Sequence, residues 1–352
     1  MIEELFDLAA IIAALGGGAF GAAIGPLPAF VFTGFMVIAG EAAVLAGGDG
    51  AITDQVAFGP VFSPAVSFGG GVAATAYAAR MGYMDGFQTD YHQAKNIVQA
   101  LGTRPDVLAV GAAFGLLGWW LQIVSETLAL PYDPIAMGVV LSAIFHRLVL
   151  GYSVIGTIRG RNVLDMSPFE RGERRSATDG GDIVRPDTDA GGSAAQPGRF
   201  AVEPWLPHQY RWGHVATIGA FAGILGGWIA IATGSPFLAF GISAASLLFL
   251  NLGIEKVPVT HHITLPAGTA ALAVMASGDA VVAGLGESGA LLVAIVFGVV
   301  CALFGELFQR VFYAHGDTHV DPPAAAIVFG TLLVALLYFA GIFPDAAWVP
   351  TL

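Results

Sequence analysis

Ten apolar runs, each about 20 residues long, limit the folds open to this chain more than any other feature of the sequence. A run of that length crosses about 30 Å of hydrocarbon as a helix, in which the backbone satisfies its own hydrogen bonds. The runs cover residues 7–24, 27–47, 57–79, 106–127 and 134–156 in the first half, and 213–232, 236–253, 260–278, 288–309 and 322–343 in the second. They predict an all-α polytopic membrane protein with about ten transmembrane helices.

The composition agrees with this class and excludes others. Hydrophobic residues make up 56% of the chain and charged residues 11%, whereas a soluble domain is about 45–50% apolar and about 25% charged. A net charge of −12 makes a poor partner for nucleic acid, so we expect the lipid bilayer as the partner. Acid-rich, lysine-poor, alanine-rich usage resembles that of halophilic archaea and some high-GC bacteria, which favours a prokaryotic cell membrane.

The basic residues set an orientation. Residues 157–212 are rich in Gly, Asp, Arg, Ser and Pro and contain eight arginines. We interpret them as a polar, partly disordered cytoplasmic linker that buries no core. Ten spans then place both termini outside the cell. The basic residues of 80–105, Lys256 and Arg310 fall inside, and only Arg147 lies within a span.

The two halves, residues 1–156 and 213–352, resemble each other. The matching positions are Gly118 with Gly305, Gln122 with Gln309, Asp133-Pro134 with Asp321-Pro322, and SPAVS at 63–67 with LPAGT at 265–269. Five spans per copy make the second copy run upside down. This five-plus-five inverted repeat resembles the architecture of urea channels, ammonium channels and several secondary transporters, although none of their family motifs is present.

The third span of each repeat is interrupted by Pro and Gly, which break or loosen helices. Such paired segments point to a transport site, so we expect the pathway between residues 57–71 and 258–270. The expected lining is Ser63, Pro64, Ser67, His261, His262, Thr264, Pro266 and Thr269. Small residues and prolines are also ordinary at helix contacts, and the two adjacent histidines could instead lie solvated at the cytoplasmic interface.

Charged residues inside spans are rare and form a second set of candidates. Glu41 and Arg147 are a possible coupling or gating pair, and Arg147 could otherwise snorkel to the cytoplasm. Glu306 could also take part in gating, although Arg310 one turn later offers an ion-pair partner.

A string of potential metal ligands precedes the last span. His315, Asp317 and His319 alternate along it and are weak candidates, because the other repeat has no matching histidines; we therefore expect no metal and no cofactor. Asp133 and Asp321 each precede a proline and are expected to cap the helices that follow.

We therefore expect a transporter or channel for a small neutral, weakly acidic or anionic solute, and no enzyme. The alternatives are a membrane scaffold that assembles through its helices and the linker, and a membrane-embedded enzyme, for which we find no catalytic motif. Close glycine spacings, Gly17/Gly21 and Gly111/Gly115, permit tight helix contacts within the protomer or in a homo-oligomer. A transporter predicts a cavity between the two interrupted segments, and a scaffold predicts solid packing there.

Overall fold

The structure is a computed structural model of the 352-residue chain and describes residues 5–84, 90–175 and 198–351. The first half contains α2 (Leu8–Ile24), α3 (Pro26–Leu45), two short π-helical segments, η1 (Ile52–Ala57) and η2 (Pro64–Phe68), and then α4 (Gly69–Arg80), the short η3 (Gln93–Lys95), α5 (Pro105–Thr127) and α6 (Pro134–Val149). The second half contains α8 (Trp212–Thr233), α9 (Phe237–Ala245), α10 (Leu248–Asn251), α11 (His261–Met275), α12 (Glu287–Phe312) and α13 (Pro322–Phe339), and α7 (Ser167–Glu170) lies between the halves.

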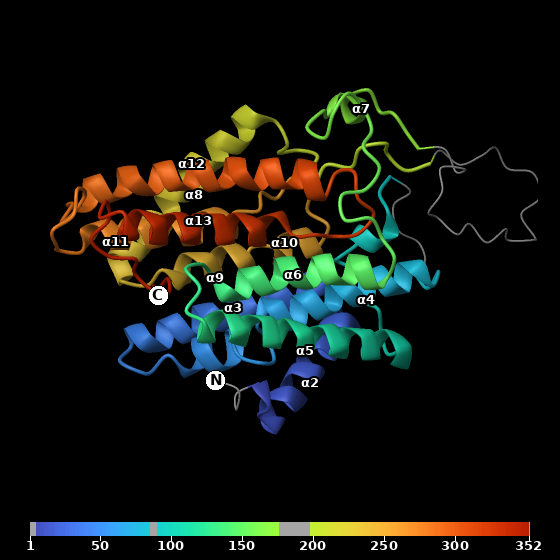
Figure 1. The fold of residues 1–352 in the computed structure, drawn as a ribbon, viewed down its shortest axis with the longest axis horizontal. Coiled ribbons are helices and arrows are strands. Elements are labelled where there is room, and N and C mark those ends of the chain that lie inside the picture. Colours follow the sequence, from blue (N-terminus) through green and yellow to red (C-terminus); the bar gives the residue numbers. More distant parts are fainter. Residues whose placement is uncertain (1–4, 85–89, 176–197, 352) are drawn as a thin grey trace, which may run out of the picture.

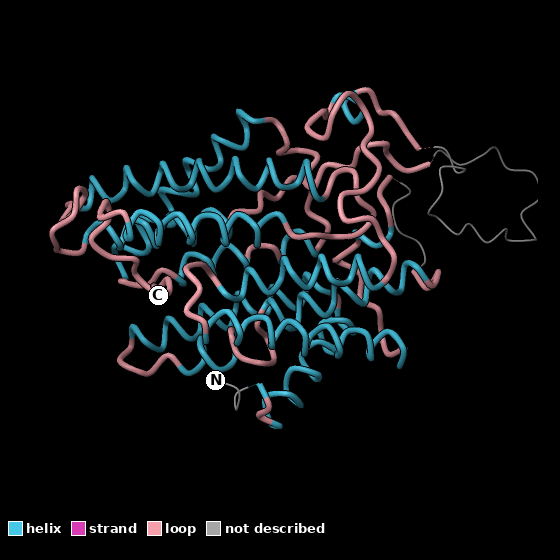
Figure 2. The backbone as a smooth tube through the Cα atoms, viewed as in Figure 1, coloured by secondary structure: helices cyan, strands magenta, loops and turns pink. Residues whose placement is uncertain are grey.

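The chain is a helical membrane protein by the length and apolarity of its helices. Five helices, α3, α5, α8, α12 and α13, are long and apolar enough to cross a membrane. Large apolar side chains are exposed on their outer faces, as Phe221 on α8 and Leu292 on α12 show with 67% and 65% exposure. Figure 2 shows that the helices run roughly side by side and that the loops gather at the two ends of the bundle.

Local signals explain where several helices begin. The carboxylate of Asp133 accepts hydrogen bonds from the backbone N–H groups of Ile135 and Ala136, and that of Asp321 accepts from Ala324. Each aspartate is followed by proline at the first helical position, where no N–H is needed. Both predicted caps are confirmed.

The first interrupted segment is broken as its prolines predict. Residues 58–63 leave the helical path between η1 and η2, and Pro64 restarts it. The second segment differs from our expectation, because α11 continues through Pro266 as one helix. A single proline removes only one backbone donor, and α11 is buried along nearly its whole length by its neighbours.

The two halves pack in the same order. In the first, α5 contacts α2, α4 and α6; in the second, α12 contacts α8, α11 and α13. The halves meet where α3 packs on α9 and α6 packs on α13. Figure 1 shows the first half, blue to green, beside the second, yellow to red.

Glycines allow the closest of these contacts within the protomer. A Cβ added to Gly18 would meet the backbone of Gly111 and Gly115, so α2 and α5 touch backbone to backbone there. Gly17 and Gly21 lie equally close to the segment 61–67. These glycines therefore make helix contacts within the protomer.

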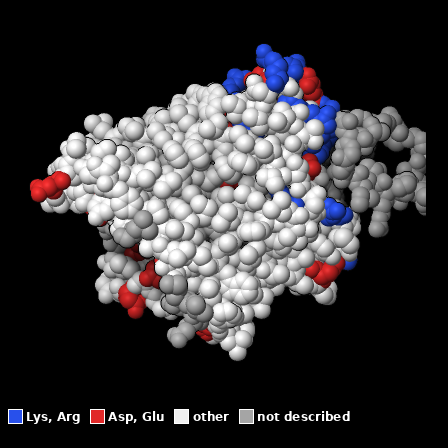
Figure 3. All heavy atoms as spheres, in the orientation of Figure 1, with Lys and Arg blue, Asp and Glu red and all other residues white. Residues whose placement is uncertain are grey.

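The flanks of the linker fold, contrary to our expectation that it buries no core. Met166, Val202 and Tyr210 form a small buried cluster with Ala314 of the loop after α12. Residues 176–197, the centre of the predicted disordered linker, lie outside the described residues. Figure 3 shows that Lys and Arg gather at the end of the bundle where α7 lies; we call it the basic end, and the opposite end the acidic end.

Candidate functional site

A cavity of about 1270 Å³ lies between the two halves. Its wall includes Phe58, Pro64 and Phe68 of the first interrupted segment and His261 and Leu265 of the second. It reaches Asp54 and Glu126 toward the acidic end and Lys95 and Lys256 toward the basic end.

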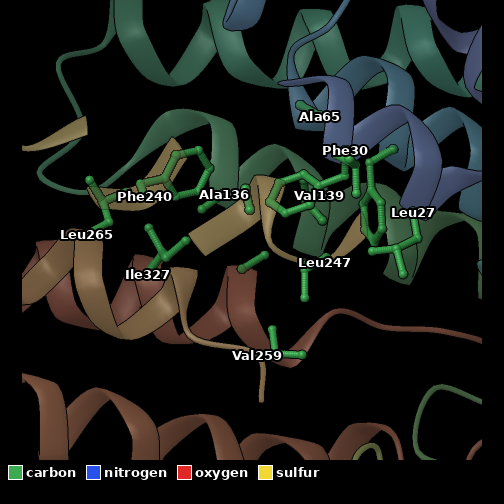
Figure 4. Packing of buried hydrophobic residues seen from close by; sticks show 14 of the residues in the cluster. Leu27, Phe30, Ala65, Ala136, Val139, Phe240, Leu247, Val259, Leu265 and Ile327 are labelled. Atoms are coloured by element: carbon green, nitrogen blue, oxygen red, sulfur yellow. The ribbon is translucent and has the colours of Figure 1, made fainter. Parts of the chain in front are cut away.

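The middle of the cavity is apolar and aromatic. Phe30 of α3 lies between the rings of Phe68, with centroids 5.8 Å apart, and Phe240, 5.9 Å apart. Figure 4 shows Phe240, Leu265 and Ile327 on one side and Leu27 and Phe30 on the other, with Val139 between them. A solute in this region would contact aromatic faces and branched aliphatic side chains.

Carboxylates outnumber ammonium groups in the described wall. The carboxylates are those of Asp54, Glu126, Asp133, Glu255 and Asp321, and the ammonium groups are those of Lys95 and Lys256. The two capping aspartates stand at the starts of α6 and α13, so each half contributes one. Asp133 also donates its backbone N–H to Thr331 of α13, over 2.9 Å, which ties the halves together.

Lys95 joins the cavity wall to the folded linker. Its Nζ lies 2.6 Å from Oε2 of Glu203, donates to the carbonyl oxygen of Tyr313 at 2.9 Å and stands 4.4 Å from the centre of the Tyr313 ring. Burial lowers the pKa of Lys95 to about 8, against the attraction of Glu203. The second carboxylate oxygen of Glu203 accepts from Arg199 at 3.0 Å.

The predicted pathway residues divide into two groups. Pro64 and His261 line the cavity. The other six are buried but are not among the lining residues; they are Ser63, Ser67, His262, Thr264, Pro266 and Thr269.

Several of the predicted hydroxyls already have protein partners. Ser63 donates to Oε1 of Gln122 at 2.6 Å, and Thr269 donates to the carbonyl of Leu265 in its own helix while accepting from the indole of Trp348. These bonds hold neighbouring segments together.

His261 and His262 point in different directions, as adjacent helical residues do. His261 lies in the cavity wall against the rings of Phe30 and Phe240, whereas His262 packs against Trp205. Both are buried, so the alternative that they are solvated at the interface is wrong.

Glu41 and Arg147 belong to separate hydrogen-bond networks and do not pair. Glu41 accepts from Thr53 at 2.7 Å and from Ser235 at 2.5 Å. Arg147 is fully buried and donates to Thr318 and to the carbonyl oxygens of Val154 and Phe312. The side chain of Arg147 extends from the last turn of α6 to loop carbonyls at the basic end, but it is buried there and does not reach solvent.

The predicted ion pair on α12 is confirmed. Nε of Arg310 donates to Oε1 of Glu306 at 2.6 Å, and both side chains are largely buried. Arg310 also donates to the carbonyl oxygens of Leu164 and Tyr210, so this pair anchors the folded linker; a gating role for Glu306 stays a prediction.

The three weak metal candidates face different partners. Asp317 pairs with Arg175 and Arg199, His319 with Asp321, and the ring of His315 contacts backbone groups of Arg159 and Val163. Among the described residues no group of three or more His, Cys, Asp or Glu side chains could hold a metal ion.

Sequence reasoning missed the Lys95–Glu203 pair and the cavity position of the capping aspartates. The available signal for Lys95 was its rarity, because the chain has only two lysines. For Asp133 and Asp321 the signal was their match in the two halves, which we interpreted only as helix capping.

Fold and cavity together define a helical membrane protein with an internal cavity of about 1270 Å³. A family described as "Family of unknown function (DUF7973)" matches residues 1–352, so the chain belongs to that family. No curated protein and no solved structure matches it.

Proposed function

We propose that this protein moves a small solute across the cell membrane, through the cavity between two inverted five-helix repeats. The observation that carries the proposal is the cavity itself, which borders both interrupted segments and reaches toward both ends of the bundle. A scaffold would have been packed solid at this contact. The alternatives of a scaffold and of a membrane-embedded enzyme have no comparable observation in their favour.

The matching packing order supports the repeat. The partners of α5 in the first half correspond one by one to those of α12 in the second, and the halves meet through the corresponding pairs α3–α9 and α6–α13. The capping aspartates of α6 and α13 occupy equivalent places. In this proposal the shorter helices α2, α4, α6, α9–α10 and α11 complete ten spans.

The charge distribution supports the orientation. The described arginines of the linker lie at the basic end, and the loops at the acidic end contain no Lys or Arg. We therefore place the basic end in the cytoplasm and both termini outside. The arginines also suit the anionic cytoplasmic leaflet.

Flux into liposomes tests the proposal. Purified protein in phosphatidylethanolamine–phosphatidylglycerol liposomes is challenged with a panel of small neutral, cationic and anionic solutes, and entry is followed by light scattering. Ala136→Trp fills the cavity wall, whereas Val296→Trp adds the same ring to an exposed site on α12 that does not line the cavity.

The proposal expects flux of at least one solute above protein-free liposomes, its loss in Ala136→Trp and its retention in Val296→Trp. Absence of flux for the whole panel, or equal flux through both variants, would contradict it.

A further inference from the structure

We infer that the cavity binds a small organic cation, specifically a protonated primary amine with an apolar body; this rests on the proposed function and names its substrate class. It departs from the neutral, weakly acidic or anionic solute that the sequence favours. The inference joins three features of the wall: its carboxylates, its aromatic rings and the buried imidazole of His261.

The charges of the wall favour a cation. Of its two ammonium groups, Lys95 is neutralised by Glu203 at 2.6 Å, and Lys256 is an exposed residue next to Glu255 at the basic end. Asp54 and Glu126 are exposed toward the acidic end, where a cation would enter from outside. Asp133 is buried and Asp321 is partly buried, and each carboxylate caps its helix, that of Asp321 also contacting His319. In a partly apolar cavity such carboxylates attract a cation more strongly than in water.

The rings supply a surface for the rest of the solute. Phe30 contacts both Phe68 and Phe240, and all three rings line the cavity. Aromatic faces carry negative electrostatic potential and attract ammonium groups, while their apolar area binds a hydrocarbon body. The same faces would repel an anion.

His261 is the independent sign of a missing polar partner. It is 5% exposed and lies in the cavity wall, and its Nδ1, which is itself shielded from solvent, has no hydrogen-bond partner among the described residues. Buried polar groups are normally paired, and a neutral imidazole always has one nitrogen that accepts. Where Nδ1 is the accepting nitrogen, an ammonium N–H would supply its donor, and Asp321, which caps α13 in the same cavity wall, would compensate the positive charge.

Three matched probes test the inference. The 2-phenylethylammonium ion, 2-phenylethanol and phenylacetate share one apolar body and differ in charge. Their binding to the full chain in zwitterionic nanodiscs is measured by calorimetry, with empty nanodiscs as the blank. We expect the ammonium to bind at least tenfold more tightly than the alcohol, and phenylacetate to bind most weakly.

Three variants locate the site. Asp321→Asn and Asp133→Asn remove a charge but keep a good N-cap, so both are expected to fold. Asp321→Asn should weaken binding of the ammonium at least tenfold and leave binding of 2-phenylethanol unchanged. His261→Phe keeps a ring in the wall but removes the acceptor, and should also weaken only the ammonium.

The inference is overturned if the alcohol or phenylacetate binds as tightly as the ammonium, or if neither aspartate variant changes affinity for the ammonium. Its failure is separate from that of transport. Flux of another solute without ammonium binding would support transport but refute a cationic substrate. Ammonium binding without any flux would support the cation site but refute transport.

Discussion

The ammonium of Lys95 and the carboxylate of Glu203 lie 2.6 Å apart with their side chains 1% and 0% exposed. One residue comes from the loop after α4 and the other from the linker, 108 positions later. Since Lys95 also lines the cavity, this pair connects the folded linker to the proposed pathway.

Removing one member of this pair should destabilise the protein strongly. Glu203→Gln leaves the buried ammonium of Lys95 without its carboxylate, which costs about 3–5 kcal/mol. Lys95→Met should cost less, because Arg199 still donates to Glu203 at 3.0 Å. Thermal unfolding in detergent, followed by tryptophan fluorescence, measures the loss. The matched control is Arg171→Ala, which breaks the exposed pair with Glu173 and should cost about 1 kcal/mol or less. Equal losses for the buried and exposed pairs would contradict the burial of Lys95.

Asp317 should make the free energy of unfolding depend on pH in the acidic range. Burial alone would raise its pKa, but Arg199 and Arg175 lower it from 3.8 to about 2. The folded state therefore binds a proton less readily than the unfolded state. Stability from this carboxylate is complete above the unfolded pKa and is lost as the pH falls toward the folded one.

The measurement is the difference in unfolding free energy between wild type and Asp317→Asn. We expect the wild type to be more stable by roughly 2 kcal/mol at pH 6, with the difference shrinking between about pH 4 and pH 2. A difference that stays constant across that range would exclude the ion pairs of Asp317 as its source.

Two glycines that match in the repeat should respond differently to the same change. A Cβ at Gly118 would collide with the backbone carbonyl of Ala65, whereas at Gly305 it would meet the His262 ring at 3.5 Å, an ordinary contact. Gly118→Ala should destabilise by about 1–3 kcal/mol, and Gly305→Ala should change stability by less than about 1 kcal/mol. Equal behaviour in thermal unfolding would refute the close contact of α5 with η2.

The sequence was sufficient for the positions of most helices. Apolar runs located the long helices closely, as α5 at Pro105–Thr127 against a predicted 106–127 shows. They were less accurate for α6, which ends at Val149 and not at 156, and for α4, which begins only at Gly69. Asp-Pro pairs located the starts of α6 and α13, because a cap acts within one helical turn. The polar composition of the linker did not predict that its flanks fold, because partners such as Lys95 and Glu203 are far apart in the chain.

The candidate site was predictable only in part. Pro and Gly marked the two segments that border the cavity, but not which side chains face it. Ser63 is an example, since its hydroxyl is used by Gln122 of α5, and no local pattern announces that contact. His261 and His262 were indistinguishable in sequence, and only the packing of α11 put one of them in the wall.

Cysteine accessibility at Leu265 tests the central claim most directly, namely that the cavity between the halves is open to water. The single native Cys301 is buried, so Cys301→Ala provides a background for Leu265→Cys in the wall, Ser142→Cys as a buried site outside it, and Val281→Cys as an exposed control. The protein in liposomes is treated with the impermeant cationic reagent 2-(trimethylammonium)ethyl methanethiosulfonate. We predict modification at positions 265 and 281 and none at 142, together with loss of solute flux on modification of 265. An unreactive cysteine at 265 beside a reactive one at 281 would contradict a water-filled pathway.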